Sequence, residues 1–283
     1  MHQNKIIKIL SVFFACTLLL VGCNEKKEEK QEETQQISNN NSEEEKHESV
    51  DNSDDNNDDD SGEMGALVVG TSADYFPFEF KKDGKIVGFD IELINAIAKK
   101  LNMKVVIKNM SFNSIIPSLE TGDIRVGIAS ISQTDEREKL VDFSIPYYSN
   151  SFALLISQDA DKYDPIKKGM NIGVESGTLM QQWILKQDLE IKVLSMDSND
   201  DLFVALKDKK IDGLLLDNST AKYLLKSDPS FSDMTIIQLQ GVSDSNIAIA
   251  VRKDDPILER INAAISELES SGFLRKLKDE WGL

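Results

Sequence analysis

The residues whose types and spacing most clearly suggest a chemical role are a lone arginine and the two acids that precede it. Arg137 lies in the stretch ISQTDEREKL, directly behind Asp135 and Glu136. A guanidinium is planar and always charged, and its fork of N–H donors fits a carboxylate with two parallel hydrogen bonds. From the residues alone, Arg137 is therefore either an anion receptor or one half of a surface ion pair, which would contribute less than about 1 kcal/mol.

The distribution of histidine and cysteine excludes several kinds of chemistry from most of the chain. The two histidines are His2 and His47, and the two cysteines are Cys16 and Cys23. Residues 66–283 therefore contain neither a Ser-His-Asp or Cys-His nucleophile nor a zinc site with histidine or thiolate ligands. We expect no catalytic residue, no cofactor and no metal there. The same residues have no basic face, which argues against a nucleic-acid partner.

Residues 1–23 have the order of a signal peptide. Lys5 and Lys8 precede the apolar run VFFACTLLLV, which is shorter than the ~20 residues of a membrane-spanning helix. The last four residues, LVGC, resemble a bacterial lipobox. The resemblance implies cleavage before Cys23 and a lipid anchor on its sulfur, palmitate included, at the extracytoplasmic face of the cell membrane. The alternative is an ordinary secretory signal in which Cys23 is incidental.

Residues 24–65 form a low-complexity segment. Sixteen acidic residues stand there against four lysines, with almost no large apolar side chains. Such a segment cannot bury enough apolar surface to offset the entropy of ordering, so we expect a disordered acidic tether. The run DDNNDDD could instead bind calcium or a partner, but a solvated spacer that lifts the rest of the chain from the membrane is the simpler interpretation.

The remaining residues alternate between strand and helix patterns, which predicts an α/β fold with two units. Asp90 is expected to cap the first helix, and Thr134 a short helix before Arg137. In α/β sheets, ligands bind at the carboxyl ends of strands. Strands are expected at 66–72, 104–109, 123–130, 191–196, 213–219, 234–239 and 246–252, and residues 171–178 are expected to form a strand, a turn and the start of a helix. Helices follow most of the strands, with Asp255-Pro256 and Gly272 marking helix boundaries near the end.

Several motifs in the same order resemble one known family across residues 66–283. The motifs are VVGTSADYFPFEF, GKIVGFDIELINAIAKKL, FNSIIPSLETGDIRVGIASISQTDEREKLVDFSIPYY and GVESGT. They resemble the amino-acid-binding proteins of ABC importers, which include the glutamine-binding and the lysine/arginine/ornithine-binding proteins. The resemblance implies a two-lobed periplasmic-binding-protein fold, with two hinge strands and the ligand cleft between the lobes.

The family's division of the chain can be placed on this sequence. The hinges would lie near 147–151 and 243–247. The first lobe would be residues 66–150 and 245–283, and the second would be residues 151–244. This explains why the last strand and helices return to the pattern of the first unit.

The resemblance also implies roles for five residues. Arg137 would receive the ligand's α-carboxylate, and Asp217 its α-ammonium. Ser130 and Ser132 match positions that add a carbonyl acceptor, a hydroxyl and a backbone N–H. Thr178 would donate its backbone N–H from a helix start, where free N–H groups favour an anion. Without the resemblance, Asp217 could equally be a cap for the helix that follows it.

Five further positions bear on the ligand's side chain. Tyr75 and Phe112 match aromatic positions that sandwich it. Ser72 stands where both relatives have an aspartate, which argues against a simple lysine or arginine pocket. Glu175 stands where the glutamine binder has a lysine, and could meet a distal cation, meet an amide, or face solvent. Leu179 replaces a glycine, which would shorten the pocket, so a neutral polar or small amino acid is expected first and a basic one second.

The expected function is to bind an amino acid without chemistry. The ligand would be delivered to a membrane permease, and the protein is expected to be a monomer. Three alternatives remain: a cyclohexadienyl or arogenate dehydratase on the same fold, with Glu175 as general acid; a ligand-sensing receptor module; and a wall-cleaving enzyme that carries this module.

Overall fold

The computed structural model describes residues 65–239 and 245–283. The predicted signal peptide, Cys23 and nearly all of the acidic segment lie outside the described residues. Within the described ranges, no helix has the length and apolar character needed to cross a membrane.

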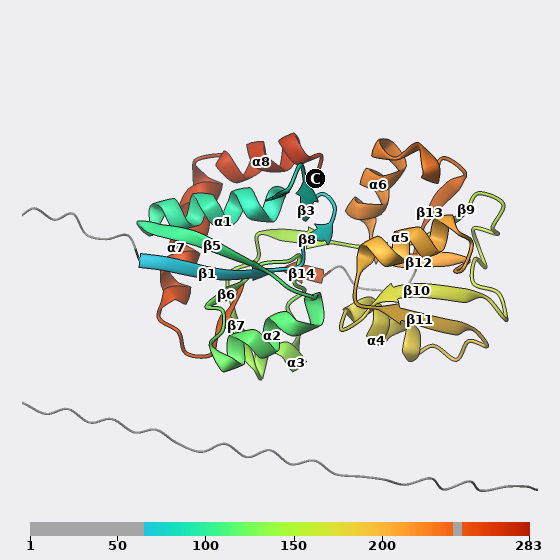
Figure 1. The fold of residues 1–283 in the computed structure, drawn as a ribbon, viewed down its shortest axis with the longest axis horizontal. Coiled ribbons are helices and arrows are strands. Elements are labelled where there is room, and N and C mark those ends of the chain that lie inside the picture. Colours follow the sequence, from blue (N-terminus) through green and yellow to red (C-terminus); the bar gives the residue numbers. More distant parts are fainter. Residues whose placement is uncertain (1–64, 240–244) are drawn as a thin grey trace, which may run out of the picture. The chain divides into compact units, whose positions relative to one another are not determined.

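The first lobe is built on a five-stranded sheet with the order β5-β1-β6-β15-β7. Strands β5, β1 and β6 are parallel, whereas β15 runs antiparallel to β6 and β7. Helices α1, α7 and α8 cover one face and helices α2 and α3 the other (Figure 1). The bounds are β1 (Gly65–Thr71), α1 (Phe89–Lys100), β5 (Met103–Asn109), α2 (Phe112–Thr121), β6 (Val126–Gly127), α3 (Asp135–Glu138), β7 (Val141–Phe143), β15 (Ala250–Arg252), α7 (Ile257–Ser270) and α8 (Phe273–Trp281).

Helix α1 shows how the sequence pattern produces this packing. Leu93, Ile94 and Ile97 recur at helical spacing and are fully buried against the sheet. The predicted cap at Asp90 is wrong: the N-cap is Gly88, and Asp90 lies in the first turn with its side chain buried. The carboxylate points instead toward the loop after β6, which gives Asp90 a part in the site.

A small three-stranded sheet projects from the first lobe. It consists of β2 (Asp74–Tyr75), β3 (Glu79–Lys82) and β4 (Lys85–Val87). Asp83 and Gly84 join β3 to β4 with φ values of 51° and 74°. Positive φ at both residues is what a two-residue hairpin turn requires, and an Asp-Gly pair adopts it readily.

The second lobe has a mixed sheet with the order β11-β10-β12-β9-β13. Helices α5 and α6 pack on one face and α4 on the other (Figure 1). Strand β9, which lies between β12 and β13, was not predicted, because its run FALLIS is buried on both faces and shows no alternation. The bounds are β9 (Phe152–Ser157), β10 (Asn171–Glu175), α4 (Leu179–Leu185), β11 (Lys192–Met196), α5 (Asn199–Lys207), β12 (Gly213–Asp217), α6 (Asn218–Ser227), a 3₁₀ turn η1 (Pro229–Phe231) and β13 (Met234–Gln238).

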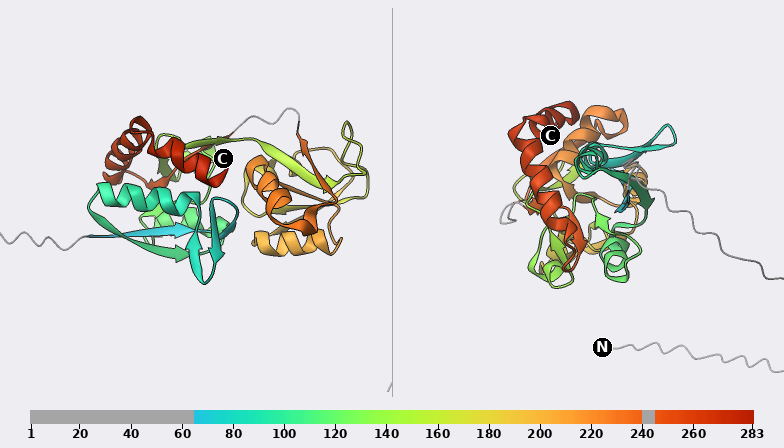
Figure 2. Two further views of the ribbon diagram at one scale, coloured as in Figure 1. Left: turned by 90° about the horizontal axis from the view of Figure 1, so that it is seen from above. Right: turned by 90° about the vertical axis from the view of Figure 1, so that its left-hand side faces the viewer.

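Two short strands connect the lobes. Strand β8 (Tyr148–Asn150) leads into β9, and β14 (Ser245–Ile247) leads back toward β15. They pair with each other in an antiparallel ladder, so the two crossings lie side by side. Figure 2 shows the chain passing from the green strands of the first lobe into the yellow-green strand of the second. The two-lobed α/β fold predicted from the sequence is confirmed.

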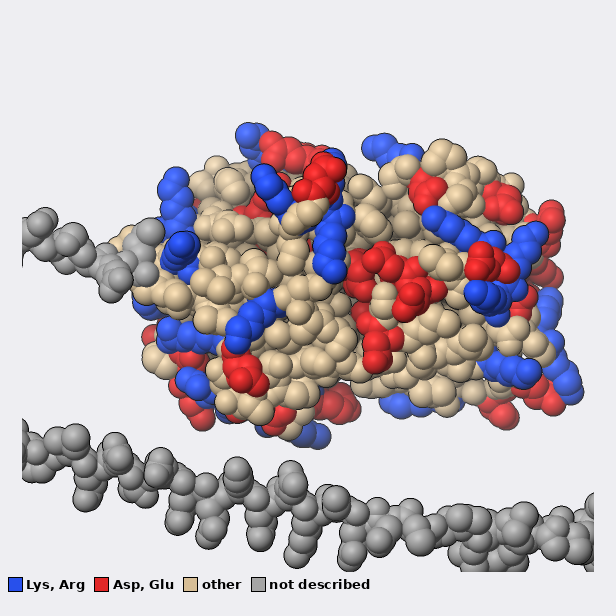
Figure 3. Space-filling view, in the orientation of Figure 1, with Lys and Arg blue, Asp and Glu red and all other residues tan. Residues whose placement is uncertain are grey.

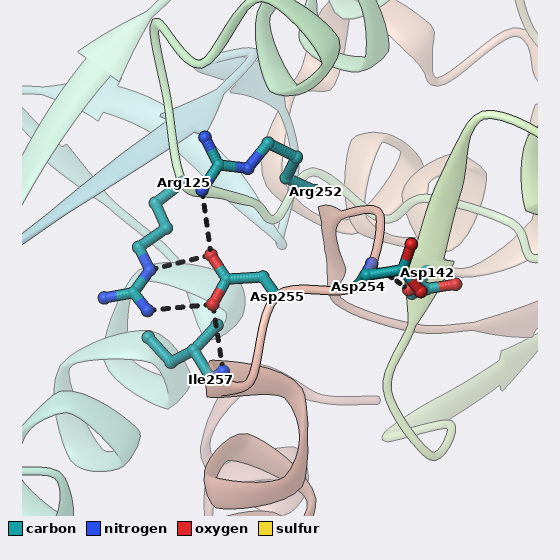
Figure 4. Close-up of polar contacts among 6 residues, drawn as sticks. All are labelled: Arg125, Asp142, Arg252, Asp254, Asp255 and Ile257. Carbon is teal, nitrogen blue, oxygen red and sulfur yellow. Dashed lines mark hydrogen bonds and ion pairs between the residues drawn. The ribbon is translucent and has the colours of Figure 1, made fainter.

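A dense polar cluster holds α7 against the first sheet (Figure 4). Arg125 donates from Nε and Nη2 to the two oxygens of Asp255, at 2.9 and 2.8 Å. Asp255 also accepts from the backbone N–H of Ile257 at 3.0 Å and lies 3.7 Å from Arg252. The predicted helix start at Asp255-Pro256 is therefore confirmed, and the hydrogen bond with Arg125 is the main reason that the pKa of Asp255 is lowered.

Candidate functional site

One small cavity lies between the lobes and is lined by residues of both. Its free interior is small, about 20 Å³ for the centre of a water-sized molecule, within about 350 Å³ of space between atoms that includes the open mouth. All ten positions singled out from the sequence line it, and three further residues complete the wall. The ten are Ser72, Tyr75, Phe112, Ser130, Ser132, Arg137, Glu175, Thr178, Leu179 and Asp217, and the three are Glu79, Ala129 and Met180.

Arg137 is a buried cation and not a surface ion pair. Only 7% of its surface is exposed, and no acid of the described residues lies within ion-pair distance of it. Its Nη1 donates to the carbonyl oxygen of Ser132 at 2.6 Å, and its Nη2 donates to that of Gly177 at 3.0 Å. The guanidinium lies 5.2 Å from the ring centre of Phe112. Burial lowers its pKa to about 10, so it stays charged at neutral pH.

The backbone around Arg137 is held in place locally. Thr134 caps the short helix α3 as predicted, with its hydroxyl accepting from the backbone N–H of Arg137 at 3.2 Å. Ser130 has a φ of 46°, a left-handed conformation that is strained for a residue with a side chain. Its backbone N–H donates to the fully buried carboxylate of Asp90 at 2.8 Å, and this hydrogen bond stabilises the strained loop.

Asp217 ends strand β12, where the chain turns into α6. It occupies the N-cap position but makes no capping hydrogen bond. Its backbone N–H donates to the hydroxyl of Tyr75 at 2.9 Å, and the hydroxyl of Ser130 lies 3.5 Å from Oδ2. Oδ1 has no partner among the described residues, and burial raises the pKa of Asp217 to about 7. The carboxyl group is therefore turned into the cavity, away from the helix that it precedes.

Glu175 and Thr178 form the wall contributed by the second lobe. Glu175 is 7% exposed, so the alternative that it faces solvent is wrong. Burial raises its pKa to about 8, and its Oε1 has no partner in the described part of the chain. Thr178 is the N-cap of α4, as expected, and its hydroxyl donates to the carbonyl oxygen of Glu175 at 2.7 Å.

The sequence analysis missed Glu79, which is 1% exposed and lines the same cavity. Burial and then the nearby Asp90 raise the pKa of Glu79 well above its usual range. The signal was present in the sequence, because Glu79 is the only charged residue in the aromatic stretch YFPFEF. With Glu79, Glu175 and Asp217, three carboxyl groups line the cavity, and Arg137 is the only cationic side chain among the described residues of its wall.

Direct contacts outside the cavity also join the lobes. Asp74 of the first lobe accepts from the backbone N–H of Asn199, the first residue of α5, at 3.0 Å. Asn113 donates to Asp197 at 3.1 Å. A second hollow beside these contacts is lined by Asp74, Asp197 and Asp200 among others. Figure 3 shows acidic side chains gathered near the middle of the face that it displays.

A cavity enclosed between two α/β lobes, with a buried guanidinium and buried carboxyl groups on its wall, defines a class of binding proteins that enclose a small charged solute. The model of the bacterial extracellular solute-binding proteins, family 3, matches residues 67–283, and the chain belongs to that family. One relative, ABC transporter arginine-binding protein 1 of Escherichia coli (strain K12), is 36% identical over 219 residues, which are 75% of this chain and 88% of that protein.

Solved structures give the same result. An ancestral arginine-binding protein bound to arginine has a TM-score of 0.72 and 38% identity, covering 77% of this chain and 98% of that one. The ancestral amino-acid-binding protein AncCDT-1, a precursor of cyclohexadienyl dehydratase, has a TM-score of 0.69 and 30% identity, covering 77% of this chain and 95% of that one. The relatives of this chain are thus solute-binding proteins, and one of them is an ancestor of an enzyme.

Proposed function

We propose that this protein captures a free amino acid outside the cytoplasm and delivers it to the membrane permease of an ABC importer. The observation that carries the proposal is a single cavity lined by the guanidinium of Arg137 from one lobe and the carboxyl group of Asp217 from the other. An α-amino acid has the opposite pair of charges on one carbon atom. Full pairing of both charges inside a closed cavity supplies affinity, because no charge is left unmatched.

Each pole of the ligand has its own group of contacts in this proposal. Arg137 receives the α-carboxylate, and the described residues accept only two of its five N–H donors. Ser132 and the backbone N–H of Thr178 add donors to the same carboxylate. Asp217 and the carbonyl of Ser130 receive the α-ammonium. The side chain lies between Tyr75 and Phe112, with Ser72 and Glu175 further along the cavity.

A cationic side chain fits the cavity better than a neutral or small one. After Arg137 is matched by the α-carboxylate and Asp217 by the α-ammonium, Glu79 and Glu175 are the carboxyl groups left for the side chain. The expectation of a neutral or small amino acid counted only one of these two acids. The hollow at Asp74, Asp197 and Asp200 supports the same choice, because its three acids outnumber its one cation, Lys81, and attract cations toward the cleft.

Ligand capture in this proposal is a hinge motion of the two lobes. The first lobe, residues 66–150 and 245–283, binds the ligand first, and closure adds the contacts of residues 151–244. The closed state is favoured because the ligand touches both walls only there. The protein acts as a monomer that Cys23 anchors through lipid to the extracytoplasmic face of the membrane, with residues 24–65 as the spacer.

The enzyme alternative is specific enough to test. Glu175 has a pKa of about 8 and is protonated at neutral pH, as a general acid must be. We propose binding without turnover, because the carboxyl groups on the cavity wall are matched by the charges of an amino acid. Incubation of the full chain with arogenate and with prephenate is expected to give no product, and release of phenylalanine or phenylpyruvate would favour the dehydratase.

The binding proposal is tested with the full-length protein and the twenty amino acids. A ligand that binds only the native state raises the melting temperature, so a thermal-shift screen identifies it and calorimetry gives its Kd. We expect Arg137→Ala to weaken binding at least about 100-fold, because the ligand's buried carboxylate then loses its charge partner. Arg275→Ala is the matched control, since Arg275 is exposed on α8. Full affinity in Arg137→Ala would refute the proposal.

A further inference from the structure

Glu79 and Asp90 form a buried pair of carboxyl groups at the wall of the cavity. They are 1% and 0% exposed, and Asp90 is close enough to help raise the pKa of Glu79. Glu79 lines the cavity, whereas Asp90 lies behind it on α1. The pair therefore has one member that a ligand can reach and one that it cannot.

The backbone holds this pair rigidly. The N–H of Phe89 donates to the carbonyl of Pro77 at 3.0 Å, and the N–H of Asp90 donates to that of Phe78 at 2.9 Å. Gly88 permits this approach, because its φ is 134° and a Cβ there would collide with the carbonyl oxygen of Phe78. The start of α1 is thus fastened to the strand that carries Glu79.

A bound proton is the positive charge available to neutralise part of the negative charge of this pair. Oδ2 of Asp90 accepts from the N–H of Ser130 at 2.8 Å and from the hydroxyl of Tyr147 at 2.9 Å. The other charged groups that act on Glu79 are the carboxylates of Asp74 and Glu175, and no cation of the described residues is among the groups that shift either pKa. Oε2 of Glu79 and Oδ1 of Asp90 have no partner in the described part of the chain.

Two carboxyl groups in contact without a cation cannot both ionise, so they share one proton. The proton belongs mainly to Glu79, because Asp90 already accepts two hydrogen bonds that stabilise its charge. The pKa of Asp90 is raised to about 6, mainly by burial, and that of Glu79 is raised well above its usual range, also mainly by burial. At neutral pH the empty pair therefore carries one negative charge and one proton.

We infer that the protonation of the Glu79–Asp90 pair depends on the charge of the ligand's side chain. The pair releases its proton to solvent when a cationic side chain binds and keeps the proton when a neutral one binds. This inference rests on the proposed function. With a guanidinium or ammonium in the cavity, the O–H bond of Glu79 breaks and the proton passes to water and buffer. With an amide side chain, the same O–H remains and donates to the amide oxygen.

The pH dependence follows from this exchange. Because binding of a cationic ligand releases a proton, its affinity rises with pH while Glu79 is protonated in the empty protein. Affinity for a neutral amide is less dependent on pH, because no proton leaves the pair. Asp217 and Glu175 also face the cavity and can lose protons to either ligand, so the informative quantity is the difference between the two ligands.

Calorimetry on the full chain measures this difference. L-arginine and L-glutamine are titrated at pH 7 in buffers of different ionisation enthalpy, and the slope of the observed enthalpy against that of the buffer gives the number of protons released. We expect arginine to release about one proton more than glutamine, and the Kd for arginine to fall as pH rises from 6 to 8. Equal proton counts for the two ligands would overturn the inference. If glutamine does not bind, the arginine count in the variants below decides.

Variants identify the source of the proton. Glu79→Gln is expected to abolish the release of the extra proton and to lower the affinity for arginine at least about tenfold, because the site loses a negative charge. Glu92→Gln, on the exposed side of α1, is the matched control and keeps the wild-type count. An extra proton that persists in Glu79→Gln but disappears in Glu175→Gln would assign the role to Glu175 and overturn the inference. Binding of neither amino acid, together with no thermal shift for any of the twenty, would instead show that the proposed function itself fails.

Discussion

Two of the buried acids in the first lobe, Asp255 and Glu79, have opposite environments. Asp255, at the start of α7, receives two bonds from Arg125 and one from a backbone N–H, and its pKa is lowered. Glu79, at the cavity, has an unpartnered oxygen and an acid as its neighbour, and its pKa is raised. A carboxyl group therefore has its hydrogen-bond partners within the fold where it stabilises the packing of a helix, and lacks such a partner where it lines the cavity.

This contrast distinguishes structural from binding carboxyl groups. A buried carboxylate with all its partners inside the fold gains nothing from a ligand. Glu175 and Asp217 each have an oxygen without a partner in the described residues, and both have raised pKa values. A ligand that provides cations to these groups stabilises the folded protein by supplying what the chain leaves out.

The largest expected effect comes from removing the satisfied acid. Asp255→Ala leaves Arg125 without its bidentate partner and α7 without its first cap, so we expect a loss of about 2–3 kcal/mol in the free energy of unfolding. Urea denaturation measures it. Because the cluster does not line the cavity, ligand affinity in the folded variant should change less than about twofold. A large loss of affinity with unchanged stability would reverse the proposed roles of the two regions.

A smaller effect is expected from neutralising an unsatisfied acid. The folded-state pKa of Glu175, about 8, lies above its ordinary value of 4.5. The stability that its proton provides is complete below pH 4.5 and is lost as pH rises toward and through 8. Glu175→Gln should therefore make the ligand-free protein less sensitive to rising pH between 5 and 8.5. Melting temperatures across this range provide the measurement, and parallel curves for variant and wild type would contradict the expectation.

The smallest effect is expected at a solvent-exposed ion pair. Lys100 and Glu267 are 2.8 Å apart, and their side chains are 35% and 66% exposed. Solvent and salt screen such a pair, so Glu267→Gln should change the free energy of unfolding by less than about 0.5 kcal/mol. The same denaturation experiment checks it. A loss as large as that of Asp255→Ala would show that burial is not what separates these acids.

Much of the fold could be predicted because its signals are local. The α1 stripe, the Asp83-Gly84 turn and the helix start at Asp255-Pro256 each depend on a few adjacent residues. The mixed order of the sheets could not be obtained in this way, because the antiparallel insertion of β15 joins residues far apart in the chain. Strand β9 was missed since its uniform burial removes the alternation by which strands are recognised.

Most residues around the cavity were identified through the resemblance to amino-acid-binding proteins. Local sequence patterns alone indicated only that ligands would bind at the ends of strands. Their roles as ligand contacts remain predictions. Glu79 and Asp90 show what local patterns did not supply: Glu79 was not singled out, and Asp90 was interpreted as a helix cap. Their importance depends on contact between a hairpin and a helix, which only the tertiary structure defines.

The antiparallel insertion of β15 also constrains when the protein can fold. Among the described strands, β7 pairs only with β15, and β15 links it to β6. A nascent chain that has emerged only as far as the second lobe therefore lacks the strand that completes the first. The sheet of the first lobe is therefore complete only after residues 250–252 have been synthesised.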